Sequence, residues 1–154
     1  MNDNKSADSP VHGEAASTAL ALPISKLRGV PPQARTALKR RRINTCGRLL
    51  EEAGDAGKRA ALAQAARIEP PLLEQLVQRA DMARVKGVGA VFCLMLEEVG
   101  VRDVAALAAQ EPAELCERLR EWNAQERLAR RSPTPEEVEA WVDQARQLPI
   151  LVRY

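Results

Sequence analysis

Val85-Lys86-Gly87-Val88-Gly89 is the stretch on which the fold depends, because an apolar helix must begin directly after it. In residues 90–99 the apolar side chains recur at i, i+3, i+4 and i+7, which predicts one buried helical face of Phe92, Met95, Leu96 and Val99. Two glycines around a small apolar residue allow a sharp turn. They also leave backbone N–H groups exposed at the start of the next helix.

A second copy of this stretch lies 58 positions upstream, where Leu27-Arg28-Gly29-Val30 aligns with Val85-Lys86-Gly87-Val88. The alignment continues to Thr45 and Asp103, and both residue types are good N-caps. We therefore predict an internal duplication of one helical unit. The first copy has Pro31 where the second has Gly89, followed by Pro32. A proline at 89 should be tolerated if that position opens a helix.

The order of hydrophobic residue, any residue, Gly, hydrophobic residue, Gly before a helix resembles the helix-hairpin-helix motif. That motif holds nucleic-acid phosphates through backbone N–H groups without reading base sequence. The composition suits helices, since Ala, Leu and Val are abundant and the chain has one Phe, one Tyr and two Trp. We expect an all-α fold of two tandem helix-hairpin-helix units (SAM-like helical bundles) and a C-terminal helix that clasps them.

The charge pattern separates the two units. Residues 24–67 hold eleven Lys and Arg against three acids, whereas residues 68–154 hold eleven against fifteen. We predict a disordered N-terminal tail over 1–21, a basic unit over 22–67, an acidic unit over 68–131, and a terminal helix with an extended tail over 132–154, packed on the body. Thr134-Pro135-Glu136-Glu137 has the form of a capping box and should start the terminal helix.

The chain also resembles a bacterial family known as domain of unknown function 4332, over residues 22–154. The resemblance rests on Arg84 to Gly89, on the helix that begins at Pro112, and on the ending from Pro135 to Pro149. It implies a duplicated helix-hairpin-helix fold and no established activity.

The candidate phosphate-binding residues combine basic side chains with the two turns. Arg35, Lys39 and Arg42 lie at i, i+4 and i+7, so they share one face of a helix that we predict from 31 or 32 to 42. The first unit lacks N–H donors at 31 and 32, and the second lacks basic residues after its turn. The nucleic-acid-binding candidates are Lys26, Arg28, Gly29, Val30, Arg35, Lys39, Arg42, Lys86, Gly87, Val88 and Gly89.

Three simpler interpretations stay open. The glycines can serve only to turn the chain between packed helices, and the basic face can be a solvated surface. The third is a protein-interaction module with no nucleic-acid binding. Its acidic unit would bind a basic partner or another copy of the chain, with Phe92 and Trp122 as exposed anchors.

Several function classes find no support in the sequence. Cys46, Cys93 and Cys116 lack metal-ligand spacing, and the one histidine, His12, lies in the polar tail. Adjacent carboxylates such as Glu97 and Glu98 diverge by about 100° on a helix. No run approaches the roughly 20 apolar residues of a membrane span. We expect a cytoplasmic, non-enzymatic protein with no metal, cofactor, membrane or small-molecule ligand. Its partner is a nucleic acid, most simply duplex DNA, or a protein.

Overall fold

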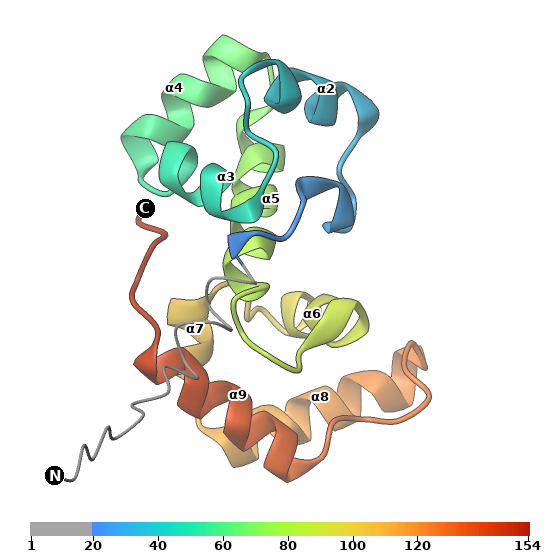
Figure 1. The fold of residues 1–154 in the computed structure, drawn as a ribbon. Helices are drawn as coiled ribbons and strands as arrows, with labels where there is room; N and C mark the ends of the chain where they lie inside the picture. Colours follow the sequence, from blue (N-terminus) through green and yellow to red (C-terminus); the bar gives the residue numbers. More distant parts are fainter. Residues whose placement is uncertain (1–19) are drawn as a thin grey trace, which may run out of the picture.

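The computed structural model describes residues 20–154, which form an all-α fold (Figure 1). This part of the chain contains no β-strand, only an isolated bridge between Pro23 and Thr45. The tail predicted over 1–21 lies outside the described residues except for its last two positions. The elements are η1 (Ile24–Lys26), α2 (Pro32–Arg40), α3 (Cys46–Ala53), α4 (Ala56–Ala66), α5 (Pro70–Met82), α6 (Gly89–Glu98), α7 (Val104–Ala108), α8 (Pro112–Glu126) and α9 (Pro135–Gln147).

The predicted N-caps are present. The Thr45 hydroxyl accepts the Arg48 N–H at 3.2 Å, and the Asp103 carboxylate accepts the Ala106 N–H at 2.8 Å. Thr134 makes the predicted capping box with its third helical residue. Each cap satisfies an N–H that the first helical turn leaves without a backbone partner. These residues therefore explain where α3, α7 and α9 begin.

The backbone repeats at the 58-residue offset beyond the caps. The Ile43 N–H donates to the Leu38 carbonyl at 2.9 Å, and the Val101 N–H donates to the Leu96 carbonyl at 2.8 Å. Both are six-to-one bonds that close the preceding helix around a left-handed residue. That residue is Arg42 in the first copy, with φ 61°, and its equivalent in the second copy is a glycine.

This helix end corrects the prediction for Arg42. The helix α2 ends at Arg40, so Arg42 lies two residues beyond it and does not continue the face of Arg35 and Lys39. The i, i+4, i+7 spacing assumed that the helix runs to residue 42. The chain instead turns there because the closing bonds place Arg42 in the left-handed region.

The buried side chains form two hydrophobic cores, and α5 runs from one to the other (Figure 1). The predicted boundary at residues 67 and 68 placed α5 wholly in the second unit. Its residues Leu73, Leu76, Val77 and Ala80 are buried in the first core, and only Met82 joins the second. The apolar face runs without a break along α5, so the sequence does not show where the first core ends and the second begins.

The C-terminal clasp is made by the tail that follows α9. The helix itself packs on α7 and α8 and buries Trp141 in the second core. Residues 148–154 then run back to α3 and α4 (Figure 1), where Val152 enters the first core. The Arg153 N–H donates to the Gly54 carbonyl at 2.8 Å, and Arg59 donates to the Arg153 carbonyl at 3.3 Å. The predicted role of a clasping helix thus falls to an extended segment.

Candidate nucleic-acid interface

Residues 20–50 carry eight Lys and Arg and no Asp or Glu. Three of these cations have partners in the structure. Arg28 and Arg48 form ion pairs, and Arg41 donates to the Ala65 carbonyl at 2.9 Å. The other five are exposed, and none has an ion-pair partner among the described residues. We call these five the basic strip: Lys26, Arg35, Lys39, Arg40 and Arg42.

The strip occupies η1, α2 and the turn that follows α2. Arg35 and Lys39 line a surface hollow of about 420 Å³, whose other walls include the polar side chains of Ser25, Thr36 and Asn44. This hollow lies between η1 and α2. Its hydroxyl and amide groups add neutral hydrogen-bonding capacity beside two cations. Such a mixture is typical of surfaces that contact phosphates.

A second basic hollow lies between α2 and α4. It encloses about 560 Å³, and its cations are Arg40, Arg41 and Arg67. Arg67 has φ 56° and closes α4 in the same way that Arg42 closes α2. The two hollows together make α2 a helix with cations along two of its sides.

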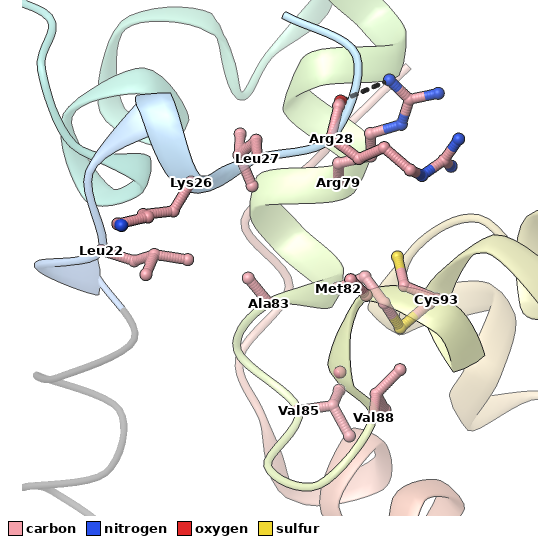
Figure 2. Close-up of a pocket in the computed structure, with 12 residues that line it drawn as sticks. Leu22, Lys26, Leu27, Arg28, Arg79, Met82, Ala83, Val85, Val88 and Cys93 are labelled. Atoms are coloured by element: carbon pink, nitrogen blue, oxygen red, sulfur yellow. Dashed lines mark hydrogen bonds between the residues drawn. The ribbon is translucent and has the colours of Figure 1, made fainter.

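Arg28 of the first turn is only partly exposed and is held in an ion pair. Arg28 forms an ion pair with Glu97 of α6 at 2.6 Å, and Glu97 also accepts from Arg79 of α5 at 2.9 Å. Arg79 donates in addition to the Arg28 carbonyl at 2.8 Å (Figure 2). A Cβ on Gly29 would lie 2.7 Å from the Arg79 guanidinium. The side chain of Arg79 therefore lies against one side of this turn, where Gly29 remains exposed.

The side chains of Val30 and Val88 pack into the hydrophobic cores. Val30 is partly buried against the first core, and Val88 is buried in the second. The apolar residue of each turn thus anchors it to the body, and its side chain is not a ligand group. Lys26 remains exposed at the end of η1.

The second turn is held from outside by α9. The Gln144 side chain accepts the Lys86 N–H at 2.9 Å and donates to the Lys86 carbonyl at 3.0 Å. Gly87 and Gly89 are exposed, with φ of 92° and 68°. Proline cannot adopt a positive φ. The expectation that proline would be tolerated at 89 is therefore wrong, because Pro31 has φ −61° and the aligned positions differ in backbone conformation.

The two turns face one cavity of about 210 Å³ (Figure 2). Leu27 and Arg28 contribute from the first turn, and Val85 and Val88 from the second. Most other lining side chains are apolar, and they include Cys93. Burial raises the pKa of the Cys93 thiol to about 11, so the thiol stays protonated and is a weak nucleophile at neutral pH.

Residues 20–154 hold no group of three or more His, Cys, Asp and Glu that could bind a metal ion. None of the helices in this range is both long and apolar enough to cross a membrane. Two carboxylates are engaged in ion pairs, Glu97 with Arg28 and Arg79, and Glu137 with Arg131 at 2.5 Å. Arg131 holds the pKa of the Glu137 carboxyl down at about 2.

The list of candidate residues omits Arg40 and Arg67, and it does not anticipate the pairing of Arg28. Arg40 does not share the i, i+4, i+7 spacing of the predicted face. It could have been found from the composition of residues 20–50, which contain no acid. The pairing of Arg28 with Glu97 has no local signal, since 69 residues separate them. Arg67 likewise joins the hollow beside α2 only because α4 packs there.

The comparisons with known proteins agree with the resemblance described above. Neither curated proteins nor solved structures gave a match to the chain. The sequence pattern of the family described as Domain of unknown function (DUF4332) matches residues 28–148, which is most of the chain and includes both turns. The chain therefore belongs to the DUF4332 family.

Proposed function

We propose that this protein is a non-catalytic nucleic-acid-binding protein that contacts the phosphates of duplex DNA without reading base sequence. The observation that carries the proposal is the basic strip, with five exposed cations on a segment that contains no acid. Like charges held close together on one surface repel one another. A polyanion bound across the strip relieves this repulsion and releases the counterions condensed on the nucleic acid.

The composition of the strip favours duplex over single strands. Residues 20–50 contain no aromatic side chain on which an unpaired base can stack. Phe92 packs on Trp141 with ring centroids 5.4 Å apart, so it too is engaged within the protein. The remaining contacts are cations and hydroxyl or amide groups suited to the sugar–phosphate backbone. Such contacts position a protein on a duplex but carry no sequence information.

We further infer that residues 28–30 and 86–89 are helix-hairpin-helix turns with different tasks. The first is flanked by Lys26 and the basic α2, while its own donors are reduced by Pro31 and Pro32. The second retains N–H groups at Gly87, Val88 and Gly89 beside Lys86. The first turn supplies cations and the second supplies backbone N–H donors, so one nucleic acid would contact both turns.

The test is a direct binding measurement with duplex, branched and single-stranded probes at low and high ionic strength. We expect micromolar affinity at physiological salt, with log K falling by about 0.9 per phosphate contacted on a duplex. Preference for the duplex should persist when its sequence is scrambled. Absence of binding at low salt, with capture of a basic protein instead, would favour the protein-interaction module.

A further inference from the structure

The helix α6 begins differently from every other α-helix in residues 20–154. The others have a side-chain cap, a proline in the first turn, or both. Its N-cap is Val88, which provides no side-chain hydrogen bond, and no acid lies in its first turn. The N–H groups at this end carry the positive end of the helix dipole. They are left for a partner outside the helix.

An independent observation concerns Trp141, which lies beside Gly87 in the turn that leads into α6. Trp141 of α9 is 2% exposed, yet its indole N–H makes no hydrogen bond within residues 20–154. Every fully enclosed side-chain nitrogen or oxygen in that range has a partner, so the indole nitrogen must reach solvent through a small opening. A buried tryptophan N–H normally finds an acceptor. This donor is therefore placed for an acceptor that the chain itself does not supply.

Gly87 locates the opening. A Cβ built on Gly87 would lie 3.6 Å from the Trp141 Nε1 atom and within 4 Å of no other atom in that environment. Because Gly87 has no side chain, an acceptor can approach the indole N–H at the usual distance of about 2.9 Å. Any larger residue would place carbon in that space.

The surroundings hold this arrangement in place. Gln144 fixes both backbone groups of Lys86, and Phe92 packs against the Trp141 ring. The exposed Lys86 side chain supplies a cation beside the turn. Arg131 lies over Phe92 at 5.5 Å, although its charge is shared with Glu137. Donors fixed before binding lose little conformational entropy when the ligand arrives.

We propose that the second turn is an oxyanion site that takes one phosphate oxygen, with the Trp141 indole N–H as a specific donor. The N–H groups that begin α6 and the charge of Lys86 complete it. The inference rests on the proposed function for the source of that phosphate, the backbone of a nucleic acid. Free inorganic phosphate offers the same chemistry and is the second source to be tested.

The experiment follows the indole N–H resonances of the full-length protein, which contains two tryptophans. We expect saturating duplex to shift the resonance that disappears in Trp141→Phe and to leave the Trp122 resonance in place. Trp141→Phe should weaken duplex binding about tenfold, since it removes one hydrogen bond to a charged acceptor. Trp122→Phe is the matched control and should bind as wild type.

A second pair of variants keeps the test valid if Trp141→Phe does not fold. Gly87→Ala fills the space before the indole, whereas Gly100→Ala introduces the same left-handed strain, φ 88° against 92°, with nothing within 4 Å. We expect Gly87→Ala to weaken binding more than Gly100→Ala does, and to reduce the Trp141 shift.

The outcomes separate this inference from the proposed function. Duplex that binds through the basic strip while the Trp141 resonance stays in place overturns the oxyanion site alone. Inorganic phosphate that shifts this resonance when no duplex binds supports the site with free phosphate as its ligand and overturns nucleic-acid binding. No shift with either ligand, or equal effects of the two alanine variants, overturns the site.

Discussion

Asp81 and Arg84 form an ion pair in the interior, with 2.6 Å between a carboxylate oxygen and a guanidinium nitrogen and side chains 3% and 4% exposed. The pair ties three segments together. The second Asp81 oxygen accepts the Val104 N–H that begins α7, at 2.9 Å, and Arg84 also donates to the Pro149 carbonyl at 2.6 Å. It therefore joins the end of α5 to α7 and to the start of the C-terminal tail.

Removing one member of this pair should be costly. We expect Arg84→Leu to destabilise the protein by roughly 3–5 kcal/mol, because an unpaired carboxylate is left in the interior. The double variant Asp81→Asn with Arg84→Leu should recover part of that loss, since Asn can still accept the Val104 N–H. Urea unfolding of Arg84→Leu, Asp81→Asn and the double variant gives the coupling energy. An Arg84→Leu protein as stable as wild type would contradict the account.

Arg42 and Gly100 occupy equivalent left-handed positions, and exchanging their residue types should have opposite effects. Arg42→Gly removes the strain of a side chain at φ 61° and should raise the free energy of unfolding by about 1 kcal/mol. Gly100→Arg should lower it by a similar amount. Arg42→Gly should also weaken DNA binding, because the strip loses a cation. Thermal unfolding measures the stability and duplex titration measures the affinity. A destabilised Arg42→Gly protein would refute the left-handed backbone conformation at Arg42.

These backbone details mark the limit of sequence reasoning for this chain. Thr45, Asp103 and the capping box at Thr134 could be predicted because a cap is a local interaction between neighbouring residues. The left-handed Arg42 could not, because arginine carries no preference for that region, whereas Gly100 at the equivalent position does.

The candidate site was predicted less well than the helices. The basic character of α2 is a property of composition, so Arg35 and Lys39 could be named correctly as exposed cations. The neutralisation of Arg28 depends on α6 packing across the first turn, and the position of Trp141 under Gly87 depends on α9. Both are contacts between distant segments, which one sequence without its fold does not specify.

The proline substitution at the second turn now has a clear expected result. Gly89→Pro forces φ from 68° towards about −65° and should destabilise the protein by more than about 1 kcal/mol. Pro31→Gly is the comparison variant. Glycine can keep the φ of −61° observed at position 31, so this change acts only by increasing the conformational entropy of the unfolded chain. Chemical unfolding decides the matter. A Gly89→Pro protein that unfolds at the wild-type midpoint would show that the two turns share one backbone conformation.

Acid should weaken the ion pair between Arg131 and Glu137, the glutamate of the α9 capping box. The Glu137 pKa is lowered to about 2 in the folded protein from an ordinary value of 4.5, mainly by its hydrogen bond from Arg131. The stabilisation is therefore complete above about pH 4.5 and is lost as pH falls towards 2. Glu137→Gln should be less stable than wild type at neutral pH, and the difference should shrink across that window. Thermal unfolding of both proteins across a pH series measures this difference in stability. A difference that stays constant with pH would be evidence against a stabilising Arg131–Glu137 ion pair.

The most direct test of phosphate binding compares two charge reversals of equal size. Arg35→Glu, Lys39→Glu and Arg42→Glu together invert most of the basic strip. Arg120→Glu, Arg127→Glu and Arg130→Glu make the same charge change on exposed residues of α8 and the loop after it, and Arg127 matches Arg42 in its left-handed backbone, with φ 51°.

The measurement is duplex affinity of both variants across a salt series, with helicity checked by circular dichroism. The account predicts that the strip variant loses binding, whereas the control keeps most of the wild-type affinity and salt dependence. Any residual binding by the strip variant should show a salt slope smaller by about one unit for each phosphate contact removed. Equal affinity of the two variants, both folded, would contradict the account.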